Sequence, residues 1–192
     1  MNAANRTRIT DPAVMRALAH PVRLALLEHF GQHPEGATAT ECAQVVELSP
    51  SATSYHLRAL AKVGMIREAP SRGDGRERVW QASHDSYEIG NERDATDEEA
   101  AAEAALIETY LARQNDKVRR YLAVARAEPE DWYDASVIGE QALVLTAREL
   151  KRLRTQIDEL VEPLKVRNRD KPPRSARPVS FQIRAVPTDI PS

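Results

Sequence analysis

The segment 49–64 holds the side chains whose types and spacing most clearly suggest chemistry. If it is helical, one face presents two short hydroxyls, an aromatic ring and two cations: Ser51, Ser54, Tyr55, Arg58 and Lys62. The opposite face is mostly apolar, through Thr53, Leu57, Leu60 and Ala61. Polar groups near the start of such a helix can reach base edges in a major groove, and cations can reach phosphates. An ordinary surface helix is also amphipathic, so the neighbouring elements must decide between these two interpretations.

The ends of this helix are marked in the sequence. Ser49 is a good N-cap, Pro50 suits the first helical position, and Gly64 can adopt the left-handed conformation that ends a helix. A preceding helix is predicted from Thr38, which forms the capping-box spacing with Glu41. The connection between them is only a few residues long. Two helices joined in this way form a helix-turn-helix arrangement.

Two further helices and a hairpin surround this arrangement. One short helix is predicted over 12–19, and a second from Pro21 to Gly31, because the residue before a proline avoids helical geometry. After Gly64, strand-like segments flank the glycines of 71–75, which predicts a hairpin with Arg72 and Arg76 at its tip. A phosphate-binding loop is the alternative, but the Gly-x-x-x-x-Gly-Lys-Ser/Thr pattern is absent and no helix follows directly.

Three separately placed motifs carry a family resemblance: the stretch Leu18-Ala19-His20-Pro21-Val22-Arg23-Leu24, the helix from Ser49 and the Arg-Gly-Asp-Gly-Arg hairpin. Over residues 12–84 the chain resembles the ArsR-type winged helix-turn-helix repressors of bacteria. The resemblance implies a homodimer that binds double-stranded DNA at a palindromic operator, with the second helix of the motif in the major groove. It places these residues at the DNA: Ser51, Ser54, Tyr55 and His56 in the groove, Arg58 and Lys62 near phosphates, and Arg72, Arg76 and Arg78 on the wing.

Two positions depart from the family pattern. Tyr55 stands where many relatives carry arginine, so the base preference cannot be transferred. Glu47 stands where the turn usually has glycine, and a positive φ there would cost about 1 kcal/mol. His56 has two open interpretations, a phosphate contact or packing at the helix edge, whereas His20 is expected to cap or pack.

Metal sensing, which many relatives perform through cysteines, is not expected here. The corresponding segment 36–40 has no thiol, and Cys42 is expected to be a small apolar core residue. His29 and His33 have a possible ligand spacing, but Gly31 is expected to end the helix between them, and His84, Asp85 and Glu88 form a second loose group. Transition-metal sites usually need three or four converging ligands. We therefore expect no metal and no cofactor.

The second half begins with a long alanine-rich helix over 97–127. Its heptad seam predicts a dimer interface, although a helix packed within one subunit gives a similar pattern. The seam residues are Ala104, Ile107, Leu111, Val118 and Tyr121, interrupted by the polar Gln114.

A small strand–helix–strand module is predicted to follow, with strands at 136–145 and 179–186 and an amphipathic helix ending near Lys165. Trp132 and Tyr133 are expected to pack in a core or interface, with an effector pocket as the alternative.

Charge and composition fit this interpretation. Residues 50–80 carry six cations and three acids, although the whole chain has a net charge of −2. A single cysteine, and no apolar run of membrane or signal-peptide type, lead us to expect a cytoplasmic protein.

The expected fold is mainly α with a small β component (α+β), divided into a flexible arm (1–10), a winged helix-turn-helix domain (11–88) and a C-terminal dimerisation and possible effector region (89–192). The expected function is that of a homodimeric transcriptional regulator, with repression as its expected sign, and not that of an enzyme. An unknown small-molecule effector is a further possible partner. The alternative is an enzyme or protein-interaction module in the C-terminal region, with the winged helix as an accessory.

Overall fold

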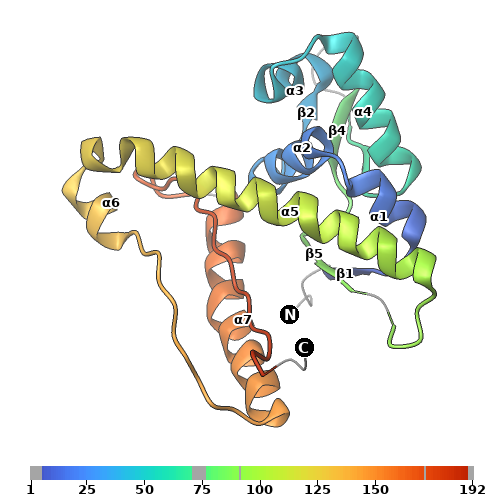
Figure 1. Ribbon diagram of the computed structural model, residues 1–192. Coiled ribbons are helices and arrows are strands. Elements are labelled where there is room, and N and C mark those ends of the chain that lie inside the picture. Colours follow the sequence, from blue (N-terminus) through green and yellow to red (C-terminus); the bar gives the residue numbers. More distant parts are fainter. Residues whose placement is uncertain (1–5, 71–76, 91, 171, 190–192) are drawn as a thin grey trace. The chain divides into compact units, whose positions relative to one another are not determined.

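The computed structural model describes residues 6–70, 77–90, 92–170 and 172–189, and of Arg6, Arg169 and Asp170 only the backbone. The chain divides into two compact units, Met1–Ala135 and Ser136–Ser192 (Figure 1). The helices of the first unit are α1 (Pro12–Leu18), α2 (Pro21–Gln32), α3 (Ala39–Val46), α4 (Pro50–Lys62), α5 (Asp97–Val124) and α6 (Glu130–Ala135), with a short 3₁₀ helix η1 (Ala125–Ala127) after α5.

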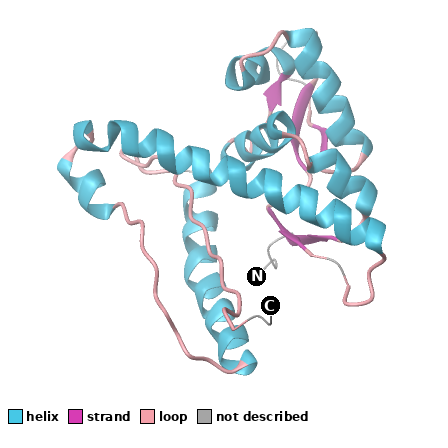
Figure 2. Cartoon of the chain, in the orientation of Figure 1, coloured by secondary structure: helices cyan, strands magenta, loops and turns pink. Residues whose placement is uncertain are grey.

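Short strands accompany these helices in the part of the chain that the structure describes (Figure 2). They are β1 (Arg6–Ile9), β2 (Ala37–Thr38), β3 (Ile66–Glu68), β4 (Val79–Ala82) and β5 (Ser86–Ile89). The central strand of the larger sheet is β4, which pairs antiparallel with both β2 and β3, and Arg67 lies opposite Gln81. Together with α3 and α4, this sheet confirms the predicted α+β winged helix-turn-helix fold, and α5 is the predicted long helix.

The helix ends follow the signals in the sequence. Thr38 and Glu41 form a reciprocal capping box at α3, in which the Thr38 N–H donates to Glu41 Oε2 at 2.6 Å. At α2, the imidazole Nδ1 of His20 accepts from the Val22 N–H at 3.2 Å, and Pro21 occupies the first position of the helix. His20 is therefore a cap, as predicted. The helix continues to Gln32, one residue beyond the predicted end at Gly31, so that predicted end is wrong. Gly31 does not have the positive φ of a glycine that ends a helix.

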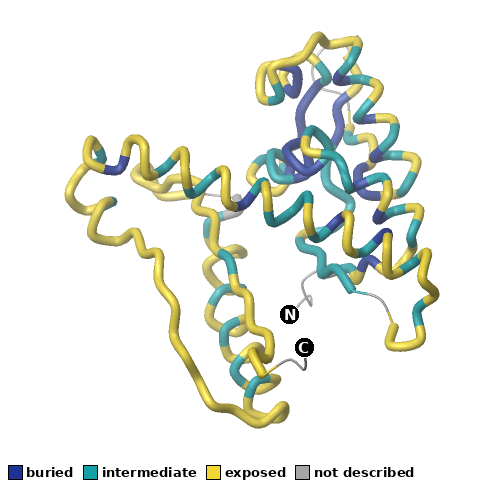
Figure 3. The backbone as a smooth tube through the Cα atoms, viewed as in Figure 1, coloured by how far each residue is buried: buried dark blue, intermediate teal, exposed yellow. Residues whose placement is uncertain are grey.

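The core of the first unit lies where α1, α2 and α4 meet the sheet and α5 (Figure 3). Its largest fully buried side chains include Met15, Leu18, Leu24, Leu26, Phe30, Leu57, Leu60, Ile66 and Leu106. Each such side chain contributes roughly 1.5–3 kcal/mol by leaving water. Cys42 is fully buried among them, as expected, and burial raises its thiol pKa to about 11. This packing holds α4 in a fixed orientation relative to the wing.

The boundaries of the first unit differ from those expected. Residues 1–10 were predicted to be a flexible arm, but Arg6–Ile9 form β1, which pairs in parallel with β5. Ile9 is only 3% exposed, so its burial explains the order of this strand. The boundary predicted at residue 88 falls inside the unit, because α5 packs along α1 and places Ala102 and Leu106 in the core.

The second unit contains one helix, α7 (Ala147–Asp170), among its described residues. Thr146 and Glu149 form the predicted capping box, with the Thr146 N–H donating to Glu149 Oε2 at 2.8 Å, and the helix runs past the predicted end at Lys165. The predicted strand–helix–strand module is wrong: 136–145 and 179–186 have no strand pairing. A strand needs a neighbouring backbone to accept and donate its hydrogen bonds, and β-type composition alone does not supply one.

None of the helices in the described part of the chain combines the length and apolar character that a membrane crossing requires.

Candidate nucleic-acid interface

Helix α4 has one fully buried face and one exposed face. Thr53, Leu57 and Leu60 are 0% exposed and anchor the helix to the core. The Ser49 hydroxyl caps the helix by accepting from the Ala52 N–H at 3.2 Å, and Pro50 takes the first position. This anchoring determines which side chains the helix presents to solvent.

The exposed face carries the predicted DNA-contacting residues of α4 other than His56. Ser51, Arg58 and Lys62 are exposed, Ser54 is half-buried, and Tyr55 is 64% exposed, which is unusual for so large a ring. Arg58 Nε donates to the Ser54 carbonyl oxygen at 3.2 Å, which directs the guanidinium back along the helix. The structure thus brings together hydroxyls, one tyrosine and two cations on the side opposite the core.

The turn before α4 adopts the conformation expected from its sequence position. Glu47 has φ 55° and ψ 41°, in the left-handed region, and its N–H donates to the Ala43 carbonyl. Leu48 donates to the same carbonyl at 3.2 Å. A glutamate in this conformation costs about 1 kcal/mol relative to glycine. The turn therefore closes the end of α3 and starts α4 three residues later.

His56 lies away from the exposed face, at the edge of α4 next to α2. Its ring centroid is 4.7 Å from that of His20, and its buried Nδ1 has no hydrogen-bond partner among the residues that the structure describes. Burial lowers the pKa of both histidines; Arg23 lowers that of His20 further, and His20 and Arg23 lower that of His56. Of its two open interpretations, the contact with His20 favours packing at the helix edge, and the contact of His56 with DNA stays a prediction.

The wing is attached to the helix-turn-helix through side chains at its base. The Thr40 hydroxyl of α3 donates to Glu77 Oε1 at 2.9 Å. Arg78 pairs with Glu68 at 3.1 Å and lies over the Trp80 ring, 5.5 Å from its centroid, yet its side chain is still 58% exposed. Arg72 and Arg76, the predicted tip cations, lie outside the described residues.

Sequence reasoning missed one cation on the wing. Arg67 is exposed, whereas Ile66 before it is buried. The alternation of side chains along a strand was the available signal, because the burial of Ile66 sends its neighbour to the opposite face.

The histidine pair at the end of α2 does not extend to a larger ligand set in the described residues. The rings of His29 and His33 lie 4.3 Å apart because α2 continues past Gly31, and His33 Nδ1 is 3.2 Å from Glu35. Among the described residues, no group of three or more metal-ligating side chains converges. The two remaining aromatic candidates, Trp132 and Tyr133, lie on α6, which buries none of its residues.

Helix α5 buries its core residues and leaves its predicted apolar seam residues only partly covered or exposed. Ala102 and Leu106 are buried in the main core, whereas Ala104 is exposed. The other seam residues, Ile107, Leu111, Val118 and Tyr121, are half-buried and none of them belongs to that core. The exposed Leu122 continues the same stripe and was missed. The exposed part of the seam is therefore available for contact with the surface of another protein molecule.

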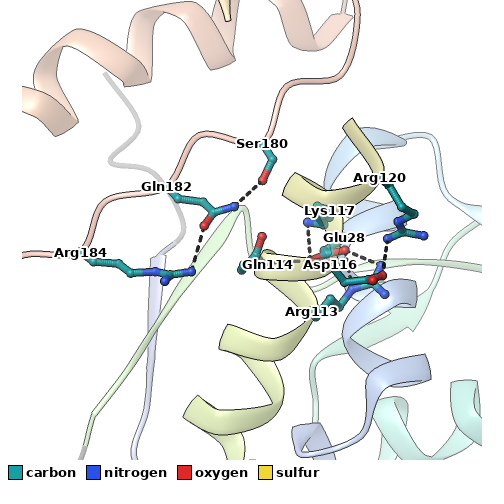
Figure 4. Close-up of polar contacts among 9 residues, drawn as sticks. All are labelled: Glu28, Arg113, Gln114, Asp116, Lys117, Arg120, Ser180, Gln182 and Arg184. Carbon is teal, nitrogen blue, oxygen red and sulfur yellow. Dashed lines mark hydrogen bonds and ion pairs between the residues drawn. The ribbon is translucent and has the colours of Figure 1, made fainter. Parts of the chain in front are cut away.

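Gln114, the polar residue of the seam, belongs to the inward side. It is 4% exposed and its amide donates to Glu28 Oε1 at 3.3 Å (Figure 4). The same carboxylate pairs with Arg113 at 2.6 Å and with Lys117 at 2.7 Å, and all three charged side chains are at most 25% exposed. These contacts attach the middle of α5 to α2.

Comparison with known families supports this interface. Residues 18–69 match the model of a family described as a helix-turn-helix domain. The match spans α2, α3, α4 and the first strand of the wing, so it covers the geometry described above. A comparison with curated proteins finds no match. The chain carries a helix-turn-helix DNA-binding domain.

Proposed function

We propose that this chain is a sequence-specific transcriptional regulator of the ArsR type, acting as a homodimer on a palindromic operator. The observation that carries the proposal is the exposed face of α4, where Tyr55, Ser51 and Arg58 stand opposite fully buried residues. A helix held rigidly by one face presents its other face to the major groove without further ordering. Such a protein binds and releases DNA and carries out no covalent chemistry.

The division of labour on the DNA follows from side-chain chemistry. Tyr55 and Ser51, on the first turns of α4, read bases, since a tyrosine ring contacts a thymine methyl and its hydroxyl reaches a base edge. Lys62, on the last turn, and the wing cations Arg72 and Arg76 neutralise phosphates. Phosphate contacts add affinity without sequence information and make binding depend on salt.

A dimer completes the proposal, because one winged helix reads only one half-site. The exposed part of the α5 stripe, from Ala104 to Leu122, supplies an apolar surface for the second subunit. Two recognition helices about 34–36 Å apart would then reach successive major grooves. Occupation of an operator in this way blocks access to the DNA, which makes repression the proposed sign. Regulation would act through residues 91–192, by changing the distance between the two wings.

The test begins with DNA that the purified protein enriches from a random-sequence pool. Binding of the enriched and of scrambled DNA is then measured by fluorescence anisotropy for Tyr55→Ala. We expect this variant to lose roughly 1–3 kcal/mol, or about 5- to 150-fold in Kd, on the enriched DNA only. Tyr133→Ala is the matched control, because Tyr133 is also exposed but lies on α6. Failure to enrich any sequence, or an unchanged Kd for Tyr55→Ala, would contradict the proposal.

A second comparison separates base contacts from phosphate contacts. Arg76→Ala should weaken enriched and scrambled DNA about equally and lower the salt slope by about one unit. Should Arg76→Ala change the base preference while Tyr55→Ala weakens both DNAs equally, the roles of wing and helix are reversed.

A further inference from the structure

The apolar stripe of α7 has the spacing of a coiled coil. Its residues follow steps of three and four, the repeat that places them at a and d of a heptad: Leu150, Leu153, Ile157, Leu160 and Leu164. None of the five is buried, and Leu160 is 72% and Leu164 51% exposed. The helix itself is well started by the Thr146–Glu149 capping box. A defined helix thus presents an apolar face that is nowhere fully buried, with Leu150, Leu153 and Ile157 half-buried and the last two residues exposed.

The rest of the second unit does not bury this face. Its described residues include no buried side chain at all. The large apolar residues on both sides of α7 are themselves exposed, for example Val144 at 103% and Phe181 at 66%. Contiguous exposed apolar surface of this kind marks an interaction site.

The charges beside the stripe favour a second copy of α7 in parallel orientation. With Leu150 at position a, Glu149 occupies g and Arg154 the next e. In a parallel pair, these g and e positions lie side by side across the interface, which gives one Glu149–Arg154 contact on each edge. In an antiparallel pair centred on Ile157, Arg154 would instead face Val161, and Glu149 would face Pro163. Of these two arrangements, the parallel one matches opposite charges.

The sequence also limits the length of the pair. Pro163 occupies a g position, outside the seam, but removes the N–H that would bond to the Glu159 carbonyl. Three residues beyond Leu164, the next d position is Arg167, so the apolar seam ends there. The described stripe therefore spans two heptads, from Leu150 to Leu164. A pair this short is marginal alone and needs the two chains to be held together elsewhere.

We propose that α7 forms a parallel two-stranded coiled coil with α7 of a second copy of this chain, through the stripe from Leu150 to Leu164. This contact lies apart from the α5 surface and from the DNA-binding helix, but it rests on the proposed dimer to bring the two chains together. Analytical ultracentrifugation of the unmodified protein tests that dimer separately, so a dimer without cross-linking would contradict the α7 contact alone.

The experiment introduces a single cysteine into the full-length chain. Leu160 and Leu153 occupy d positions, whose side chains face their counterparts across the axis of a parallel pair. Leu160→Cys is the first variant, because its site is exposed within the chain and the substitution removes no core contact. Thr155→Cys is the matched control at the outward f position. The native thiol, Cys42, is fully buried with a pKa of about 11, so unmodified protein gives the background.

Under mild oxidation, non-reducing gels should show at least several-fold more disulfide-linked dimer for Leu160→Cys and Leu153→Cys than for Thr155→Cys. Equal cross-linking at all three positions, or none at 153 and 160, would overturn the proposal. Cross-linking of Ile157→Cys without Leu153→Cys would also overturn it, because only an antiparallel pair brings the central residue alone to its counterpart.

Discussion

The imidazole of His20 caps the start of α2 only in its neutral form. Its Nδ1 accepts the Val22 N–H, and a protonated imidazole has no acceptor nitrogen, so protonation removes this cap. Protonation of His56, whose ring centroid lies 4.7 Å from that of His20, would add a second positive charge near Arg23. Both histidines have a lowered pKa in the folded chain, so the unfolded chain binds protons more readily.

We therefore predict that the winged helix loses stability as the pH falls below about 6.5, the ordinary histidine value, towards the lowered pKa of the folded state. Above that pH, this contribution to the free energy of unfolding is fully present. The measurement is the urea midpoint between pH 8 and pH 5 for unmodified protein and for His56→Gln, which should show a smaller pH dependence. His84→Gln is the control. An identical pH dependence for His56→Gln and unmodified protein would contradict the role of the pair.

The same residues show how far sequence reasoning reaches at a site. The caps at Ser49, His20 and Thr38 were predictable because each needs only a local pattern of two to four residues. The exposed row on α4 followed from helical spacing. The position of His56 did not, because a residue at the edge of a helical stripe can turn either way, and here the neighbouring ring of His20 decides.

At the scale of elements, Glu28 connects two helices that are distant in sequence. Its carboxylate accepts from Arg113, Gln114 and Lys117 of α5. Loss of this carboxylate would leave two cations, each at most 25% exposed, without their counter-charge. Partly buried charged groups that lose a hydrogen-bonded partner are costly.

Glu28→Ala should accordingly lower the free energy of unfolding by about 1.5–3 kcal/mol in urea titration. The matched control is Glu98→Ala, which removes a pair between Arg16 of α1 and α5 at 2.9 Å whose side chains are 54% and 78% exposed. An exposed pair of this kind is worth at most about 1 kcal/mol. Equal losses for the two variants would show that the Glu28 network does not hold α5 in place.

The strands that sequence reasoning missed depend on distant partners. Strand β1 exists because β5 lies beside it, and β2 has only two residues paired with β4. Neither pairing leaves a strong local pattern. Conversely, residues 179–186 have β-type composition but no described pairing, since composition does not provide a neighbouring strand.

At the scale of the whole molecule, the proposed α5 interface can be tested by charge. Leu111→Asp combined with Val118→Asp should convert a dimer to monomers in analytical ultracentrifugation, because two carboxylates would face the partner's apolar stripe. Both sites are half-exposed and lie outside the main core, so the fold should survive.

The control for this prediction places the same charge on another side of α5. Ala101→Asp with Ala112→Asp adds two carboxylates at exposed positions away from the stripe, and this protein should remain dimeric. A dimer that persists in the Leu111/Val118 variant would exclude the stripe as the interface.

The burial of Cys42 has a kinetic consequence for the whole DNA-binding unit. It is the only thiol in the chain and lies on the buried face of α3, at 0% exposure. A thiol reagent can reach it only while α3 separates from the core, so the rate of modification depends on how often α3 opens. DNA that binds only the closed form lowers the open population in proportion to its occupancy. The rate at which Cys42 is modified thus reports the opening of the helix-turn-helix, and no cysteine needs to be introduced for this measurement.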